Sequence, residues 1–197
     1  MRNVGAIVLA AGGSSRFGQA KQLLLFQGET LVRRIVRAAL EAGCGSITVV
    51  VGDARDRIET ELSDMPAAIV ENSEWRRGLG TSIHCGLRRL LSSEPQLKDV
   101  VLLACDQPFV DARVIASLIR EREHSGKPII ASSYAETLGI PALFNRVCFE
   151  ELLALPDNSG AKAFIKSRPA DVAQIEFEKG VFDIDTVADF ERMRTAG

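Results

Sequence analysis

The chain has 197 residues, enough for one domain with a substantial core, and its 46% hydrophobic and 25% charged residues are an ordinary globular composition. Lys and Arg total 24 against 26 Asp and Glu, so the net charge of −2 lacks the basic surplus usual in nucleic-acid-binding proteins. No apolar run approaches the ~20 residues of a membrane span.

We therefore expect residues 1–197 to form a single domain that binds neither nucleic acid nor membrane. The N-terminus lacks the charged lead and cleavage site of a secretory signal. The cysteines contain no C-x-x-C pair, which argues against a zinc site or a disulfide framework and indicates a reducing compartment. A cytoplasmic location is the natural expectation. The four cysteines are Cys44, Cys85, Cys105 and Cys148.

The first predicted element is a buried strand at residues 4–11, which opens directly into small residues. The whole stretch, VGAIVLAAGGSSRFGQAK, covers residues 4–21. Glycine lets the backbone approach a ligand and adopt positive φ, and consecutive N–H groups form a concave anion site. Arg16 can bind phosphate oxygens with two N–H groups, and Lys21 adds a mobile point charge. The stretch predicts a polyphosphate site made of Gly12, Gly13, Ser14, Ser15, Arg16 and Lys21.

This loop matches neither of two common phosphate-binding motifs. Gly13 and Gly18 have the Walker separation, but Gln19 and Ala20 stand where Lys and Ser/Thr should follow. The dinucleotide fingerprint G-x-G-x-x-G is absent as well. An ordinary glycine-rich turn between strand and helix is the alternative, and the cation in register at position 16 favours phosphate binding.

Beyond the loop, apolar runs alternate with amphipathic segments, which is the pattern of βαβ units and a mostly parallel sheet. Thr30 is predicted to cap a helix that ends at Gly43. One face of that helix carries the apolar side chains. Strands are predicted at 46–52 and 67–72, with a short helix at 54–62 between them. The apolar helix face consists of Leu31, Ile35, Ala38, Ala39 and Ala42.

Residues 71–91, ENSEWRRGLGTSIHCGLRRLL, form the second informative stretch. Gly78 and Gly80 precede Thr81 and Ser82, which are predicted to cap a helix that runs to Leu91. Small residues and hydroxyls at a helix start suit the wall of a ligand pocket. A loop followed by a good helix cap is the equally simple structural interpretation.

Residues 99–111, DVVLLACDQPFVD, form the third stretch. A buried strand at 100–104 is followed by Asp106, and Pro108 prevents its continuation. Open α/β sheets bind ligands at the carboxyl ends of their parallel strands. Asp106 could hold Mg²⁺ there, because this cation prefers carboxylate, water and phosphate oxygen. A helix cap or turn is the alternative role for this aspartate.

The remaining elements are expected to be helices at 111–124 and 145–155 and strands at 128–133 and 171–180. Asp183 and Asp185 precede a helix that Thr186 is predicted to cap. The chain has two histidines, and neither belongs to a recognisable nucleophile motif; G-x-S-x-G is also absent, so a serine hydrolase has no support. We expect His84 to be a helix residue and His124 to lie at the surface.

The first stretch resembles a known signature. LAAGGSSRFGQAK is similar to LAAGxSxRMGxxK of the nucleotidyltransferases that act on molybdenum cofactor (MobA-like), with Phe17 in place of Met. The family motifs N-x-x-W-x-x-G-x-G-x-S, C-D-Q-P, G-x-P-x-x-F and D-I-D-T are also matched, at 72–82, 105–108, 139–144 and 183–186. The resemblance implies a Rossmann-like three-layer α/β/α fold of the nucleotide-diphospho-sugar transferase type.

The resemblance also implies roles for individual residues. The family's G-D-x-G-A-R segment is altered here, because Asp157-Asn158 replaces Gly-Asp and Lys162 replaces Arg, which loses the bidentate fork. The implied catalytic groups are Arg16, Lys21 and Asp106, the metal ligands Asp106 and Asp185, and the acceptor-binding residues Gln107, Pro141 and Lys162. The implied nucleotide-binding residues are Leu9, Ala10, Ala11, Gly12, Gly13, Ser14, Ser15, Asn72, Gly78, Gly80, Thr81 and Ser82.

The implied reaction is a Mg²⁺-dependent transfer of CMP from CTP to molybdopterin with release of pyrophosphate, with Mn²⁺ as the alternative metal. Ala10-Ala11 before Gly12 resembles the cytidylyl branch more than the guanylyl branch. Use of GTP, or of another phosphorylated acceptor such as a sugar phosphate, stays open within the enzyme class. A non-catalytic chaperone that hands cofactor to a molybdenum enzyme is the alternative class. Each version requires the glycine loop, which we define as residues 12–21, and Asp106 to face one cleft.

Overall fold

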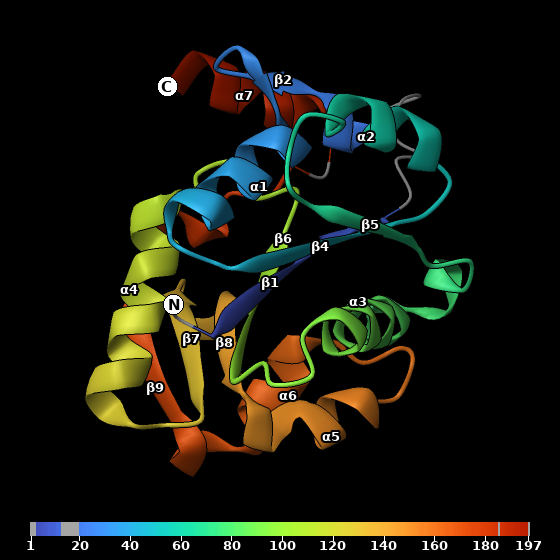
Figure 1. The fold of residues 1–197 in the computed structure, drawn as a ribbon. Helices are drawn as coiled ribbons and strands as arrows, with labels where there is room; N and C mark the ends of the chain where they lie inside the picture. The colour runs from blue at the N-terminus through green and yellow to red at the C-terminus, as the bar shows by residue number, and fades with distance from the viewer. Residues whose placement is uncertain (1–2, 13–19, 185, 197) are drawn as a thin grey trace.

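A seven-stranded sheet forms the centre of the protein in a computed structural model, which describes residues 3–12, 20–184 and 186–196 (Figure 1). Its strand order is β5-β4-β1-β6-β8-β7-β9. The first four strands in this order are parallel, β8 is antiparallel to β6 and β7, and β7 is parallel to β9. The expected mostly parallel α/β sheet is confirmed. The strands are β1 Val4–Ala10, β4 Ser46–Val51, β5 Ala68–Glu71, β6 Asp99–Ala104, β7 Ile129–Tyr134, β8 Thr137–Asn145 and β9 Val172–Glu176.

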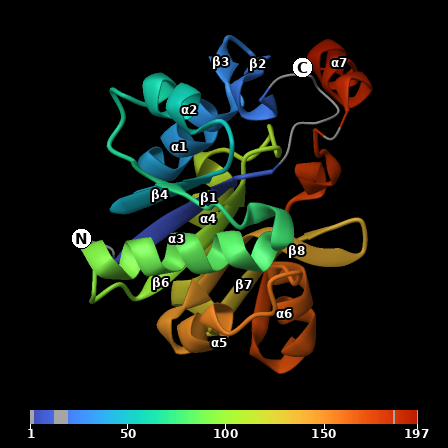
Figure 2. The ribbon, with the colours of Figure 1, turned by 90° about the vertical axis from the view of Figure 1, so that its right-hand side faces the viewer.

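Helices cover both faces of this sheet, as the views in Figures 1 and 2 show. On one face lie α1 (Leu31–Glu41), α2 (Arg55–Glu61) and α4 (Ala112–Ser125). On the other lie α3 (Leu79–Ser93), α5 (Phe149–Leu153) and α6 (Ala161–Ser167). The expected three-layer α/β/α arrangement is therefore confirmed.

The apolar run of β1 is long because the strand is buried on both faces. Ala6 and Val8 belong to the core beneath α1 and α4, whereas Ile7 and Leu9 belong to the core beneath α3. Successive side chains of a strand point to opposite faces, so a central parallel strand must be apolar throughout. The continuous apolar run at 4–11 therefore correctly predicted the strand β1.

Two of the predicted helix caps are present with hydrogen bonds. Thr30 Oγ1 accepts from Arg33 N at 3.3 Å at the start of α1. Thr186 Oγ1 accepts from Asp189 N at 3.2 Å, and Asp189 Oδ2 accepts from Thr186 N at 2.8 Å, before α7 (Val187–Ala196). This reciprocal pair satisfies two of the backbone N–H groups that every helix start leaves without an internal partner.

Two expectations about elements are wrong, and one strand was not predicted. The helix that Thr81 and Ser82 were expected to cap begins at Leu79. Both residues therefore lie inside its first turn and do not cap it. Residues 137–145 form the antiparallel strand β8, a segment for which we made no secondary-structure prediction. Asn145 does cap a helical turn, but that turn is the short 3₁₀ helix Arg146–Cys148, followed by α5, and not one continuous helix.

The strands β2 (Leu25–Phe26) and β3 (Glu29–Thr30) form a separate small antiparallel hairpin. Of the described helices, none combines the length and apolar character needed to cross a membrane.

Candidate nucleotidyl-transfer site

The ends of β1 and β6 meet at the carboxyl edge of the sheet. The two strands are parallel neighbours, with Leu9 in register with Ala104. Gly12 and Asp106 therefore leave adjacent strands in the same direction, and both line one cavity of about 270 Å³, which we call the acidic cleft. The lining residues of the acidic cleft are Leu9, Ala11, Gly12, Lys21, Leu79, Ser82, Ala104, Asp106, Gln107, Tyr134, Ile140 and Asp183.

Lys21 joins the glycine loop to the acidic loop, residues 105–109. Its Nζ donates to Asp106 Oδ2 at 2.7 Å and to the carbonyl oxygen of Ile184 at 3.2 Å. Both side chains are largely buried, with 15% of Lys21 and 25% of Asp106 exposed. A cation and a carboxylate partly withdrawn from water interact more strongly than a surface pair. The geometry brings Gly12, Lys21 and Asp106 together as expected, while Gly13, Ser14, Ser15 and Arg16 lie outside the described residues.

Gln22 fixes the beginning of the loop, a role that sequence reasoning missed. This buried amide donates through Nε2 to the carbonyl oxygen of Ala10 at 2.6 Å and to that of Gly12 at 3.1 Å. The bonds hold the chain in place where β1 ends and the cleft begins. A polar residue beside an apolar run was the available signal, but its partner atoms are backbone carbonyls that no motif records.

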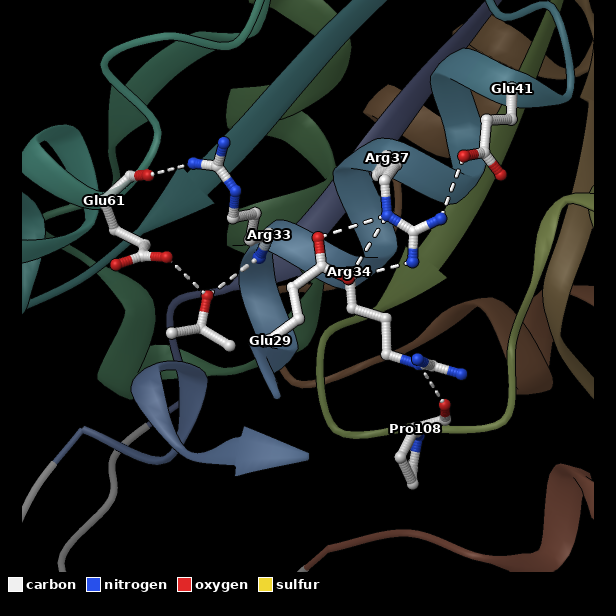
Figure 3. Close-up of polar contacts among 8 residues, drawn as sticks. Glu29, Arg33, Arg34, Arg37, Glu41, Glu61 and Pro108 are labelled. Atoms are coloured by element: carbon white, nitrogen blue, oxygen red, sulfur yellow. Dashed lines mark hydrogen bonds and ion pairs between the residues drawn. The ribbon is translucent and has the colours of Figure 1, made fainter. Parts of the chain in front are cut away.

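The acidic loop, residues 105–109, is held from three sides. Cys105 N donates to the carbonyl of Leu9, and the carbonyl of Asp106 accepts from Ile184 N at 3.0 Å. From α1, Arg34 Nε donates to the carbonyl oxygen of Pro108 at 2.8 Å. Figure 3 shows this contact beside the ion pairs through which Arg37 binds Glu29 and Glu41. The Asp106 carboxylate is therefore presented by a fixed backbone.

Three of the residues expected to contact nucleotide are joined to one another by hydrogen bonds at the start of α3. Asn72 Nδ2 donates to Thr81 Oγ1 at 2.8 Å and to Ser82 Oγ at 3.0 Å, while its Oδ1 accepts from Glu74 N. Of these three side chains only Ser82 lines the acidic cleft. Asn72 and Thr81 instead line a neighbouring groove, together with His84 and Arg88. Their direct hydrogen bonds make Asn72 and Thr81 a structural brace for the start of α3.

The two glycines before this helix are explained by backbone packing. A Cβ at Gly78 would lie 2.4 Å from the carbonyl oxygen of Asp157, and one at Gly80 would lie 2.4 Å from that of Pro156. Gly78 also has a φ of 136°, which side chains disfavour. Their small size admits the 156–158 segment, and the expected contact of these glycines with a nucleotide stays a prediction.

A second cavity of about 230 Å³, which we call the indole pocket, shares Ala11 and Gly12 with the acidic cleft. Trp75 forms one wall, packed so closely on Gly52 that a Cβ there would lie 2.8 Å from its Cδ1. Trp75 Nε1 donates to Asp53 Oδ1 at 3.3 Å. The indole pocket is lined by Ala10, Ala11, Gly12, Ala20, Gln22, Gly52, Asp53, Ala54, Arg57 and Trp75.

The expected acceptor-binding residues are not all in the acidic cleft. Gln107 lines it, and its Nε2 donates to the carbonyls of Ile140 and Gly180 at 3.2 and 3.4 Å. Pro141 does not line the cleft, because it is buried within β8, where its carbonyl accepts from Ser132 Oγ. Lys162 is exposed on α6 and is not among the lining residues, and the acceptor contacts of both residues stay predictions.

Tyr134 is a cleft residue that the sequence did not reveal. It is half-buried between Gly139 and Gly180, and its hydroxyl donates to the carbonyl of Ile140 at 3.1 Å. Burial raises the pKa of Tyr134, the negative charge of Asp183 raises it further, and a hydrogen bond from Gln107 opposes both. The phenol is therefore neutral at physiological pH and cannot supply a base.

Asp183 also lines the acidic cleft, whereas Asp185 lies outside the described residues. Within the described part of the chain, no group of three or more His, Cys, Asp and Glu side chains is arranged to hold a metal. Two carboxylates in one cleft still fit Mg²⁺, because this cation is usually bound by one or two carboxylates together with substrate phosphates and water. The donor set therefore fits a metal that arrives with a nucleotide.

The described lining of the acidic cleft contains no histidine and no cysteine. His84 is in α3, where burial and the charge of Arg88 lower its pKa, and His124 is exposed on α4, both as expected. The buried thiols are inert, because burial raises the pKa of Cys44 to about 12 and that of Cys105 still further.

In this sheet β1 leads into the glycine loop, and its parallel neighbour β6 is followed by the Asp106 carboxylate. This arrangement is that of an α/β nucleotidyltransferase-like fold. The sequence model of the MobA-like NTP transferase domain matches residues 6–172, so the chain belongs to this family. The resemblance seen in its motifs is confirmed at the family level.

Individual relatives span nearly the whole chain. Nicotine blue oxidoreductase of Paenarthrobacter nicotinovorans is 26% identical over 203 residues, covering 96% of both chains. The crystal structure of Rv0371c from Mycobacterium tuberculosis H37Rv has a TM-score of 0.84 at 26% identity, covering 98% of this chain and 97% of that one. Its homolog from Mycobacterium sp. strain JC1 has a TM-score of 0.82 at 30% identity, covering 99% and 96%. A further Rv0371c structure, at 24% identity with a TM-score of 0.79 and covering 98% and 99%, is a complex with manganese.

Proposed function

We propose that this protein is a metal-dependent nucleotidyltransferase that transfers CMP from CTP to the phosphate of molybdopterin and releases pyrophosphate. The observation that carries the proposal is the Lys21–Asp106 ion pair of 2.7 Å, which joins the glycine loop and the acidic loop inside one cleft. Residues 1–197 would act as a single domain in this reaction.

In the proposed complex, the triphosphate lies along the backbone that follows Gly12. The N–H groups of residues 12–15 and the Arg16 guanidinium would bind its oxygens, and Lys21 would face the charge that develops on the leaving pyrophosphate. The indole pocket adjoins this loop at Ala11 and Gly12, which makes it the natural place for the base. Cytosine is proposed on the strength of Ala10-Ala11 alone, with guanine as the alternative.

Asp106 would hold Mg²⁺, with Asp183 or Asp185 as a second carboxylate. Bound to the phosphates, the ion would neutralise part of their negative charge. The manganese complex of Rv0371c makes Mn²⁺ the second metal to test. Through its hydrogen bond, Lys21 would orient the Asp106 carboxylate in the cleft before substrate arrives.

The reaction requires little from the side chains beyond position and charge. An oxygen of the acceptor phosphate attacks the α-phosphorus of CTP and forms a new P–O bond. The bond from the α-phosphorus to the bridging oxygen breaks, and that oxygen leaves with its electron pair on pyrophosphate. A phosphate nucleophile is already ionised at neutral pH, so no general base is required. This agrees with a cleft whose described lining contains no histidine and a neutral tyrosine.

The test is pyrophosphate release from CTP or GTP in the presence of molybdopterin and Mg²⁺. We expect Asp106→Asn to lower turnover at least ~100-fold while leaving the fold intact, in line with the loss of a charged group that acts at the reacting phosphates. Asp56→Asn, on the exposed start of α2, is the matched control and should behave like the wild-type protein. Absence of pyrophosphate with every nucleotide would overturn the proposal.

Two other classes are separated from the enzyme by further measurements. A cofactor chaperone would retain molybdopterin transfer to a molybdenum enzyme when Asp106 is changed, whereas an enzyme would not. A relative named as an oxidoreductase raises hydride transfer as a rival. The chain lacks the G-x-G-x-x-G fingerprint of dinucleotide binding, so we expect no NADPH oxidation in the control assay.

A further inference from the structure

A groove beside α3 is lined by basic side chains that the proposed reaction does not use. It has a volume of about 660 Å³, and in the described part of the chain it shares no lining residue with the acidic cleft or the indole pocket. We call it the α3 groove. Its lining includes three basic side chains, which we call the basic cluster, and three carboxylates. The basic cluster is His84, Arg88 and Arg89, and the carboxylates belong to Glu71, Glu74 and Asp157.

The spacing of the basic cluster in the sequence places it along one side of α3. Residues four apart in a helix are neighbours on its surface, so Arg88 lies one turn beyond His84 on the same side. Arg89 is next in the chain and lines the groove as well. The apolar side chains of this helix pack in the core between α3 and the sheet; they are Ile83, Leu87 and Leu90. The helix is therefore amphipathic, and its basic side borders the α3 groove.

The carboxylates of the α3 groove already have cationic partners. Arg55 Nη1 lies 3.3 Å from Glu71 Oε2. Arg77 binds both Glu74 and Asp157, each with an N–O distance of 2.5 Å. Neither Arg55 nor Arg77 is among the residues that line the groove. The negative charges of the groove are therefore compensated by arginines that do not belong to its lining.

The two arginines of the basic cluster have no such compensation. Among the described residues, no carboxylate lies at ion-pair distance from Arg88 or Arg89. Both side chains are exposed and line the groove. An arginine presents its N–H donors in a planar fork that matches the oxygens of a phosphate or a similar anion. The pair therefore supplies both the charge and the donors that an oxyanion requires.

His84 gives independent evidence for a ligand at this place. Its side chain is only 9% exposed, yet its Nε2 has no hydrogen-bond partner among the described residues. Buried polar atoms without a partner are rare in folded proteins. Burial and the charge of Arg88 lower the pKa of His84, whereas the charge of Asp157 and the backbone carbonyls of two leucines, at 155 and 152, raise it. An anion beside Arg88 would offset the charge of that arginine and favour the protonated imidazole, in which both ring nitrogens are donors.

We propose that the α3 groove is a second binding site of this protein, for an oxyanion such as phosphate held by Arg88, Arg89 and His84. The arginines would bind its oxygens through charge-assisted hydrogen bonds, and the imidazole of His84 would gain the partner that it lacks. The site goes beyond the proposed function, because it lies outside the acidic cleft and takes no part in nucleotide transfer. A free phosphate ion and the phosphoryl group of a larger compound share this chemistry, and the test below separates them.

The test follows the imidazole NMR signals of the two histidines while sodium phosphate is added at constant pH and ionic strength. The His84 signals should shift in a saturable way, whereas those of His124, exposed on α4, should not and serve as the internal control. A His124→Gln variant assigns the signals. The double variant Arg88→Gln and Arg89→Gln should bind phosphate at least ~10-fold more weakly, since it loses charged hydrogen-bond donors. Arg113→Gln, which changes an exposed arginine of α4, should bind it like the wild-type protein.

A second titration with glycerol phosphate separates the two sources of the anion. Tighter binding of glycerol phosphate than of phosphate indicates the phosphoryl group of a larger compound, and tighter binding of phosphate indicates the free ion. Circular dichroism should show a native fold for every variant, because the arginines that are changed are exposed.

Lys21→Gln distinguishes the α3 groove from the acidic cleft, which is also expected to bind phosphate. The shift of His84 should persist in this variant, and its loss there would place the anion in the cleft and overturn the proposal. A His84 shift no larger than that of His124, or one that is unchanged in the double arginine variant, would overturn it as well. Pyrophosphate release is not measured in these titrations, so the proposed function and the anion site can fail independently of each other.

Discussion

Gln22 offers a sharp test of how the glycine loop is held. Its Nε2 donates to two backbone carbonyls, at 2.6 and 3.1 Å, in a buried position. Gln22→Leu removes both hydrogen bonds and deprives the buried Ala10 carbonyl of this donor, whereas the carbonyl of the exposed Gly12 can bind water, so we expect a loss of about 1–3 kcal/mol in the free energy of unfolding. The start of the loop should also shift, which should lower kcat/KM for CTP.

Gln22→Glu adds a pH dependence to the same test. An ionised carboxylate at this position would face two carbonyl oxygens, whereas a protonated carboxyl could still donate to one of them. The pKa of the introduced carboxyl should therefore lie above its unfolded value of about 4.3, and a rise of about two pH units corresponds to about 3 kcal/mol. Because the folded pKa is the higher one, the penalty is absent well below pH ~4, grows as the pH rises between the two pKa values, and is complete above pH ~7.

Urea unfolding at pH 5 and pH 8 measures this difference. We expect Gln22→Glu to be destabilised by about 2 kcal/mol more at pH 8 than at pH 5, relative to the wild-type protein at each pH. Gln96→Glu, at an exposed position, should show no such difference. Equal destabilisation of Gln22→Glu at both pH values would refute the assignment of the amide as a donor to two carbonyls.

Three further predictions concern the cleft itself. Lys21→Gln removes the cation from Asp106, and we expect turnover to fall at least ~100-fold with the fold retained by circular dichroism; activity within a factor of ~3 would contradict its role. Gly52→Ala would place a Cβ 2.8 Å from Trp75, so the indole should move and the KM for the nucleotide should rise, with kcat as the internal control. Removal of divalent metal with EDTA should abolish pyrophosphate release, and Mg²⁺ or Mn²⁺ should restore it in the wild-type protein but not in Asp106→Asn.

The site was predictable where its chemistry follows directly from a strand end. Glycines after β1 and an aspartate after β6 are local signals, and the parallel sheet brings consecutive strand ends to one edge. That is why Gly12, Lys21 and Asp106 meet as expected. The caps at Thr30 and Thr186 were equally local, since each is decided within four residues of sequence.

The sequence signals were ambiguous where one residue type can serve two purposes. Gly78 and Gly80 suited a ligand wall, but the segment at 156–158 occupies the space beside them. Thr81 suited a helix cap, but the helix starts earlier, and its hydroxyl accepts from the Asn72 amide instead. Hydroxyls and glycines satisfy backbone and ligands equally well, so only the neighbouring chain distinguishes the two roles.

By itself, the sequence determined the parallel sheet, its helices and the strand ends that carry charge, because burial on both faces demands continuous apolar runs and because glycine and aspartate act locally. Only the tertiary structure decided which distant groups complete the cleft. Tyr134 and Asp183 arrive there from β7 and the segment after β9, elements that are brought close by sheet pairing and by the bond between Ile184 and Asp106. Contacts between residues so far apart in the chain depend on how layers pack, and no local pattern of residue types encodes that packing.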